Sequence, residues 1–234
     1  IVEKLMDKAP TALSDKWGSL LDVNFKLLIL KALSPIDIQV IAPDGRKVGK
    51  NFQTDLEINE IDGAFYSGFL TDNEYVAIFN PIEGTYKVVT RGTGNGGKYT
   101  VVAGYISGDS LNESEVTSHI LPNSQEEIGV IINANDSGAL LEAEETTVIT
   151  LYDLRNHLEQ MYGLGWITNP KFKNKLAKIV DEAIEEWEED KEIEDDFGEE
   201  FLEKLENGFK KNLLTAEGYG FLREDLAMLV VNNQ

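Results

Sequence analysis

Hydrophobic and polar residues alternate from residue 24 to about residue 132, with a period close to two. Turn residues such as Pro43-Asp44-Gly45 separate the apolar runs, and glycine there adopts a positive φ at little cost. The runs are Phe25 to Leu33, Ile36 to Ile41, Glu74 to Phe79, Thr85 to Thr90, Tyr99 to Ile106, Glu115 to Leu121 and Glu127 to Ile132. This spacing predicts an antiparallel β-sandwich of seven or eight strands over residues 23–135.

From Thr146 onward the period lengthens to about 3.6 residues, which predicts helices. Asn169-Pro170 marks the clearest helix start, because Asn caps a helix well and Pro fits the first helical position. Four apolar stripes begin near Val148, Phe172, Phe201 and Phe221. Short connections between four amphipathic helices predict a small bundle over residues 146–234. The expected fold class is therefore an all-β sandwich followed by a small all-α helical bundle, α+β overall, with the domain boundary in residues 133–145.

The first 22 residues fit neither pattern, and we expect them to be the tail or a helix of a preceding domain. The chain begins Ile1-Val2-Glu3, with neither an initiator Met nor a signal peptide. The sequence is therefore interpreted as a piece of a longer polypeptide.

The chain is strongly acidic: 42 Asp and Glu face 21 Lys and Arg, for a net charge of −21. This balance argues against nucleic acid and anionic membranes as partners, because phosphate binding needs clustered basic residues. No apolar run approaches the roughly 20 residues of a membrane span. The chain has no cysteine, which excludes disulfides, thiolate catalysis and Cys-ligated metals.

The segment Gly92-x-Gly94-x-x-Gly97 has the spacing of a dinucleotide-binding loop. Such a loop needs a helix after the glycines, because the pyrophosphate binds the free N–H groups of the helix N-terminus. The following residues, Lys98 to Val102, are rich in β-branched and aromatic side chains and predict a strand instead. We therefore expect the glycines to turn a β-hairpin, with nucleotide binding as the alternative.

Histidine is the commonest general base, and the chain has two, His119 and His157. The sequence places them in different modules, without a Gly-x-Ser-x-Gly or His-Glu-x-x-His motif nearby. Surface or boundary positions are the default interpretation of both. Paired carboxylates remain an alternative route to hydrolysis, but with so many acids almost any spacing occurs.

The acidic run at residues 181–200 suggests calcium, but Gly198 does not lie in the register of an EF-hand loop. Ala183 and Trp187 continue the apolar stripe through the run, so we expect a helix whose acids form a solvated face. The candidate calcium ligands are the turn residues Asp44 and Asp72, and Asp195 and Asp196 in the acidic run.

Phe65 and Tyr66, in a Phe-Tyr-Ser-Gly-Phe stretch, are candidates for stacking on a sugar ring. Aromatic residues in such positions also serve as core or hydrophobic cover. Both interpretations stay open at the level of sequence.

Four stretches resemble a β-sandwich module found toward the C-terminus of secreted bacterial hydrolase-like proteins. They are SPIDIQVIAPDGRKVGK, NEIDGAFYS, NPIEGTYKVVTRGTGNGGKYTVVAGY and ILPNSQEEIGVIIN. The stretch from LYDLRNHLEQMYGLGWITNPKFKNKLAKIVDEA to LREDLAMLVVN is similar to the FIMAH domain, a helical module of bacterial exported proteins. It carries Leu154, Leu158 and the Gly165 to Asn169 element, and departs in its acid-rich middle.

Neither resemblance carries catalytic residues, and both imply an accessory role. We expect a non-catalytic C-terminal region of a larger exported bacterial protein, extracellular or at the cell surface, serving structure, spacing or attachment. Its expected partner is a neighbouring domain of the same polypeptide. The alternatives are a module that binds polysaccharide or the cell wall, and a hydrolase with an unidentified carboxylate site.

Overall fold

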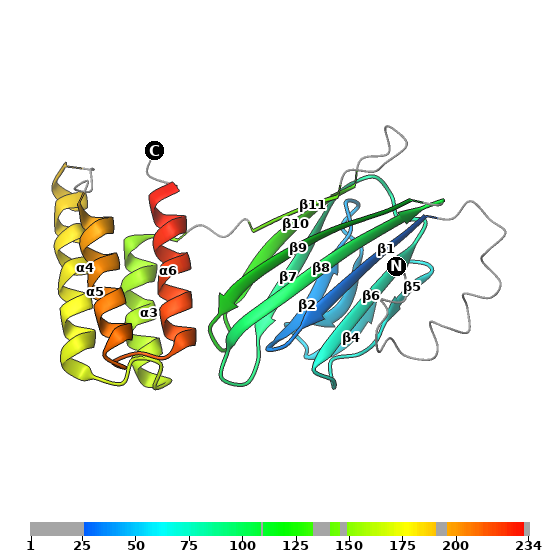
Figure 1. The fold of residues 1–234 in the computed structure, drawn as a ribbon. Coiled ribbons are helices and arrows are strands. Elements are labelled where there is room, and N and C mark those ends of the chain that lie inside the picture. The colour runs from blue at the N-terminus through cyan, green and yellow to red at the C-terminus, as the bar shows by residue number, and fades with distance from the viewer. Residues whose placement is uncertain (1–25, 109, 133–140, 146–148, 191–195, 232–234) are drawn as a thin grey trace. The chain divides into compact units, whose positions relative to one another are not determined.

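The computed structural model describes residues 26–108, 110–132, 141–145, 149–190 and 196–231 (Figure 1). Backbone contacts divide the chain into two compact units, residues 1–146 and 147–234. Among the described residues, the first unit contains the strands and the second contains the helices. The expected order, β-structure followed by α-helices, is therefore confirmed.

The first unit consists of two antiparallel sheets, sheet A and sheet B (Figure 1). Sheet A has the strand order β5-β6-β1-β8-β9, with β1 (Lys26–Leu33), β5 (Ala64–Tyr66), β6 (Asn73–Phe79), β8 (Gly97–Ser107) and β9 (Ser110–Ile120). Sheet B has the order β11-β10-β7-β2-β3-β4, with β2 (Ile36–Ile41), β3 (Lys47–Asn51), β4 (Leu56–Asn59), β7 (Gly84–Gly92), β10 (Gln125–Ile132) and β11 (Leu141–Glu145).

The structure has more strands than the alternation predicted. The additional strands are β3, β4, β5 and β11, which are too short or too polar to show a period-two pattern. The sandwich also extends further than expected. Strand β11 pairs with β10, from Ile128 opposite Glu145 to Ile132 opposite Leu141. Its sequence Leu-Glu-Ala-Glu-Glu has no strand propensity of its own, so pairing to a long neighbour determines its conformation. This corrects the expected sandwich limit at residue 135.

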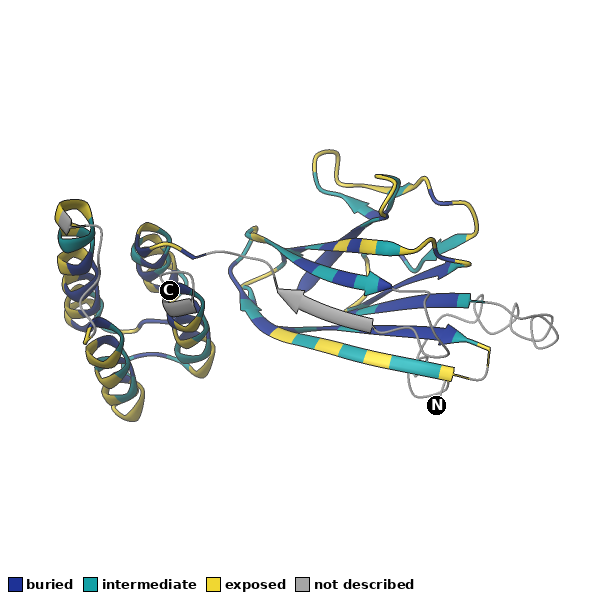
Figure 2. Cartoon of the chain, turned by 90° about the horizontal axis from the view of Figure 1, so that it is seen from above, coloured by how far each residue is buried: buried dark blue, intermediate teal, exposed yellow. Residues whose placement is uncertain are grey.

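The core of the sandwich is built from buried side chains of both sheets, and Figure 2 colours the buried residues dark blue. Leu28 and Leu30 of β1 contribute from sheet A, and Ile38 and Val40 of β2 contribute from sheet B. A second apolar cluster lies on the outer face of sheet A and includes Leu27 and Ile29 of β1, Ala77 of β6, Ile106 of β8 and, partly buried, Phe65 of β5. Central strand β1 is therefore apolar on both faces.

Strand β9 is one edge of sheet A and runs for 11 residues. Exposed and partly buried side chains alternate along it, and Glu113, Glu115 and Thr117 are among the exposed ones (Figure 2). The other edge of sheet A, β5, has only three residues.

The glycine-rich loop connects β7 in sheet B to β8 in sheet A, so it is a crossover between the sheets. The hairpin prediction is wrong, because β7 pairs with β2 and β10 while β8 pairs with β1 and β9. Gly96 has φ +66, and a Cβ there would lie 2.3 Å from the carbonyl oxygen of Ile120. The glycines thus permit a close backbone approach. A strand follows them, not the helix that a phosphate-binding loop requires.

The described part of the second unit forms helices α3 (Leu151–Gly163), α4 (Pro170–Asp190), α5 (Phe197–Lys210) and α6 (Ala216–Val231). Thr150 caps α3 in a capping box with Asp153. The Asn169 side chain accepts a hydrogen bond from Phe172 N at 3.0 Å, which confirms the predicted start of α4. The apolar faces meet in a core that includes Leu154, Leu158, Met161, Leu176, Val180, Phe201, Leu205 and Leu222.

The acidic run does not form one continuous helix, which corrects that expectation. Helix α4 ends at Asp190 and α5 begins at Phe197. The intervening residues 191–195 lie outside the described part of the chain. Within the described helices, none is long and apolar enough to cross a membrane.

Candidate functional site

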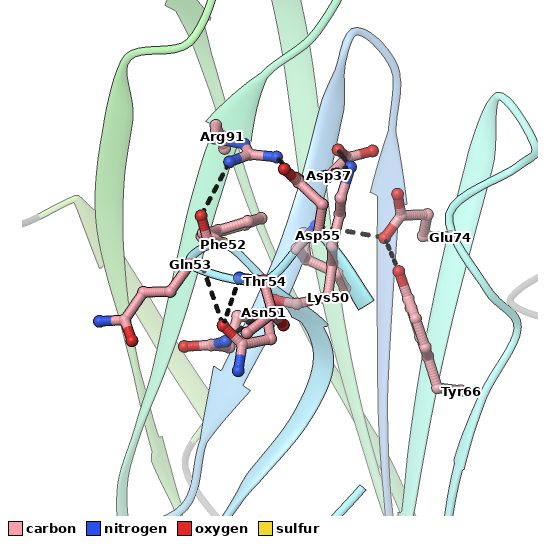
Figure 3. A network of polar contacts seen from close by, with 12 residues as sticks. Asp37, Lys50, Asn51, Phe52, Gln53, Thr54, Asp55, Tyr66, Glu74 and Arg91 are labelled. Carbon is pink, nitrogen blue, oxygen red and sulfur yellow. Dashed lines mark hydrogen bonds and ion pairs between the residues drawn. The ribbon is translucent and has the colours of Figure 1, made fainter. Parts of the chain in front are cut away.

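A buried carboxyl group connects the two sheets. Glu74 lies on β6 of sheet A and is only 1% exposed. Its Oε2 accepts hydrogen bonds from Ile38 N on β2 of sheet B, at 3.1 Å, and from the Tyr66 hydroxyl on β5, at 2.7 Å (Figure 3). Its other oxygen, Oε1, is buried without a hydrogen-bond partner among the described residues. Such an oxygen is costly to bury and calls for a physical explanation.

The Ile38 amide is available because β3 pairs with only part of β2. The register begins at Gln39 opposite Gly49, so no β3 residue is paired with Ile38. Gly49 has φ +123, and a Cβ there would lie 2.5 Å from the Ile38 carbonyl oxygen. Only glycine accommodates this close approach. Beyond it, the Gln39 side chain donates to the Lys50 carbonyl oxygen at 2.9 Å, which holds β3 beside β2.

An ion pair lies beside this carboxyl group. Lys50 Nζ is 2.7 Å from Asp37 Oδ2, and the two side chains are only 12% and 9% exposed. The Lys50 ammonium also lies 4.3 Å from the centre of the Phe69 ring, a cation–π distance. We call Asp37, Lys50, Tyr66 and Glu74 the sandwich polar cluster.

The turn between β3 and β4 covers the ion pair (Figure 3). Asn51 Oδ1 accepts from Gln53 N at 2.9 Å and from Thr54 N at 3.3 Å, which shapes the turn. Arg91 of β7 donates to the Phe52 carbonyl oxygen at 3.1 Å and pairs with Asp55. The turn is therefore fastened to the sheet by charged and backbone contacts.

Burial, helped by the neighbouring Asp37 and opposed by the hydrogen bonds from Tyr66 and Ile38 N, raises the pKa of Glu74 to about 8. Glu74 is therefore mostly a neutral acid at pH 7. Burial and the nearby Glu74 also raise the pKa of Tyr66, which keeps its hydroxyl proton available for donation. At the rim, the hydrogen bond from Arg91 lowers the pKa of Asp55.

The helical unit has its own buried carboxyl group. Asp225 of α6 is 4% exposed, and its Oδ2 lies 2.7 Å from Nδ1 of His157 on α3. Phe221 packs edge-on against the imidazole, with ring centres 5.0 Å apart. Burial raises the pKa of Asp225, and the hydrogen bond with His157 opposes that shift. The pair joins α3 to α6.

A shallow groove of about 360 Å³ lies on α3 and α4, lined by Arg155, Asn174, Ala177, Lys178, Asp181, Glu182 and Glu185. Its basic residues are already paired: Arg155 Nε lies 2.8 Å from Asp181, and Lys178 pairs with Glu182. The groove is therefore an ion-paired surface.

Three of the candidate calcium ligands, Asp44, Asp72 and Asp196, lie in separate segments of the described chain. Asp44 accepts from Arg46 N and Nε at 3.1 and 2.8 Å, which is turn chemistry. The Asp72 carbonyl oxygen accepts from Ser34 N, at 3.0 Å. Asp196 occupies the N-cap position of α5 without a side-chain capping bond, and Asp195 lies outside the described residues. Among the described residues, no group of three His, Asp or Glu side chains is placed to hold a metal ion.

The candidate sugar-stacking residues point to opposite faces of sheet A. Phe65 packs on the outer apolar cluster, and Tyr66 packs on the core with its hydroxyl on Glu74. Neither side chain is fully exposed. The two histidines are also separate, His119 on β9 and His157 on α3.

The largely buried charged residues Asp37, Lys50, Glu74 and Asp225 were not predicted from the sequence as site residues. Glu74 had a usable signal, because it shares the inward parity of Val76 and Ile78 on β6. Asp225 had a weaker one, among the apolar residues of the last helix. Asp37 and Lys50 had no signal in the sequence, because their burial depends on the β3–β4 turn, which is distant in sequence from Asp37.

Comparison with known proteins found no match: no family model, no curated protein and no solved structure matches this chain.

Proposed function

We propose that this chain is a non-catalytic accessory region of a larger exported bacterial protein, serving structure, spacing or attachment. The observation that carries this proposal is the use of its buried ionisable groups. Glu74 joins β6 to β2 and β5, and Asp225 joins α6 to α3. These are the groups whose burial would suit acid–base chemistry, and each stabilises the packing of its own unit.

Access to these groups also favours an accessory role. Glu74 is 1% exposed and Asp225 is 4% exposed, so a substrate atom reaches neither without local opening of the fold. A general acid or base must lie within hydrogen-bond distance of the group it serves. The tandem arrangement of two compact units suits a spacing role.

The proposal is tested with the full chain against chromogenic ester, peptide and glycoside substrates. We expect no turnover above the level of the Glu74→Gln and His157→Gln variants. Asp62→Asn is the matched control, because the Asp62 side chain is fully exposed. Hydrolysis that is lost in either buried-site variant and retained in Asp62→Asn would establish an enzyme and reject the accessory role.

Binding to polysaccharide or the cell wall is the second candidate, and one observation favours it. Phe209 of α5 is 40% exposed and stacks on Tyr219 of α6, with ring centres 4.6 Å apart. Exposed aromatic faces stack on sugar rings. Co-sedimentation of the chain with purified cell walls or insoluble polysaccharide tests this function. Retention should fall in Phe209→Ala but not in Leu70→Ala, which removes an even more exposed apolar side chain from the sandwich.

A further inference from the structure

The sandwich polar cluster brings together an amine, a carboxylate and a carboxylic acid away from water. Lys50 Nζ already touches the Asp37 carboxylate, at 2.7 Å. Glu74 lies next to Asp37, is 1% exposed, and has one oxygen without a hydrogen-bond partner among the described residues. An ion pair alone does not require this third group.

We propose that Lys50 and Asp37 form an intramolecular amide cross-link between β3 and β2, with Glu74 as the proton-transfer group. This modification is independent of the proposed accessory function.

The reaction is a condensation that balances without a co-reactant. A proton passes from the Lys50 ammonium to the Asp37 carboxylate, which gives a neutral amine and a neutral acid. The amine nitrogen attacks Asp37 Cγ to form the C–N bond. Glu74 donates its proton to the departing Asp37 oxygen and receives one from the nitrogen. The Cγ–O bond breaks, the oxygen leaves as water, and Glu74 ends as the acid it was at the start.

The protonation state of Glu74 suits this role. Burial raises the pKa of Glu74 to about 8, so its proton is available for donation at neutral pH. Tyr66 and Ile38 N hold the carboxyl through Oε2, which leaves Oε1 free for the transfer. Glu74 is a catalytic residue in this reaction because it touches the reacting group.

Proximity supplies the remaining driving force. Amines and carboxylates in water remain ion pairs, whereas groups held in contact reach effective concentrations of roughly 10⁵–10⁸ M. Gly49 and the Gln39 hydrogen bond fix β3 beside β2, and the β3–β4 turn covers the pair. Burial also disfavours the charged forms that must be neutralised before attack.

Another lysine–carboxylate pair provides an internal control. Lys173 Nζ lies 2.7 Å from Glu159 Oε2, the same separation as in the cluster. The Glu159 carboxylate is 46% exposed, and Arg155 is its other partner. Glu159 has a lowered pKa, because hydrogen bonds from Lys173 and Arg155 stabilise its charge. We therefore expect no condensation at this pair.

Intact mass spectrometry of the denatured full chain is the first test. We expect a mass lower by one water molecule than the sequence requires. After trypsin digestion, residues 32–46 and 48–87 should appear as one branched peptide, uncut after Lys50 and linked through Asp37. An unmodified mass, or a water loss that maps to another position, overturns the proposal.

Variants test the role of each group. Lys50→Arg and Asp37→Asn each change one reacting group, and Glu74→Gln keeps hydrogen-bond acceptance but cannot shuttle a proton as an acid. We expect Lys50→Arg and Glu74→Gln to show the full mass, and Lys173→Arg to keep the water loss. Asp37→Asn should still link, losing ammonia in place of water. A link that persists in Glu74→Gln overturns the role assigned to Glu74, and a link that persists in Lys50→Arg overturns the proposal as a whole.

Discussion

The two units bury a carboxyl group in different ways. Glu74 in the sandwich accepts hydrogen bonds from two neutral donors, a backbone amide and a tyrosine hydroxyl. Asp225 in the helical unit is bonded to an imidazole, which carries a positive charge when protonated. Burial raises the pKa of both groups. The comparison indicates that the sandwich accommodates its acid by keeping it neutral, whereas the helical unit places its acid against an imidazole.

The pH dependence of stability should reveal this difference most strongly. The pKa of Glu74 is raised from 4.5 to about 8, so the folded chain retains a proton that the unfolded chain releases. The stabilisation of the folded chain by this retained proton is complete below about pH 4.5 and is lost as the pH rises to about 8. Relative to Glu74→Gln, the wild-type free energy of unfolding should fall by about 3–5 kcal/mol over this window. Urea unfolding between pH 4.5 and 9 measures it.

A constant offset between the two proteins, such as a covalent link present in only one, leaves this slope unchanged. If the difference in free energy of unfolding between the wild type and Glu74→Gln does not vary with pH, Glu74 is ionised in the folded protein.

Removal of the Glu74 carboxyl is the next largest effect. Glu74→Ala leaves the Ile38 amide and the Tyr66 hydroxyl buried without an acceptor, at roughly 1–3 kcal/mol for each group. Relative to Glu74→Gln, which also lacks the proposed Lys50–Asp37 link, we expect Glu74→Ala to lose about 3 kcal/mol at pH 5. Urea unfolding of both variants measures the losses. Equal losses in the Ala and Gln variants would mean that the hydrogen bonds of Glu74 do not stabilise the sandwich.

The His157–Asp225 pair should show a smaller, pairwise coupling. A double-mutant cycle with His157→Gln and Asp225→Asn should give about 1–2 kcal/mol, as expected for residues in direct contact. The Tyr152–Glu188 pair of α3 and α4 is exposed and serves as the control, with an expected coupling below about 0.5 kcal/mol. Comparable couplings at both pairs would show that burial adds nothing to the histidine contact.

The smallest effect concerns the acidic face of α4. Glu182, Glu185, Glu186 and Glu189 lie three or four residues apart, and like charges at that spacing oppose a helix by a few tenths of a kcal/mol each. Raising sodium chloride from low ionic strength to about 0.15 M should therefore raise the melting temperature of the helical signal by a few degrees at most. Circular dichroism measures this change.

Calcium at the same ionic strength should add little beyond sodium chloride. A calcium-specific rise that disappears in the Asp195→Asn, Asp196→Asn double variant would show a binding site in the acidic run.

The sequence was most informative where local patterns determine the structure. Period-two alternation predicted the long strands, and Asn169 marked the start of α4 correctly. Short strands such as β5 were missed because pairing to β6 stabilises them. The path of the glycine loop was also missed, since a turn sequence does not specify which sheet the next strand joins.

The candidate site was mostly unpredictable for the same reason. Glu74 was detectable by its inward parity on β6. The burial of Asp37 and Lys50 depends on the β3–β4 turn, on Phe69 and on the approach at Gly49, which are tertiary contacts. Residue type and spacing contain no direct record of such contacts.

Strand β9 has a consequence for self-association. In the order of the described strands β9 ends sheet A, and a long strand at a sheet edge can template pairing with the edge of another molecule, which leads to aggregation. On β9, the exposed Glu113 and Glu115 would bring negative charge close to negative charge when two copies align along this edge. The opposite edge of the sheet is the three-residue β5, too short to support an extended intermolecular ladder. Sheet A thus resists polymerisation because negative charge repels a second copy at β9 and because β5 is too short to pair with one.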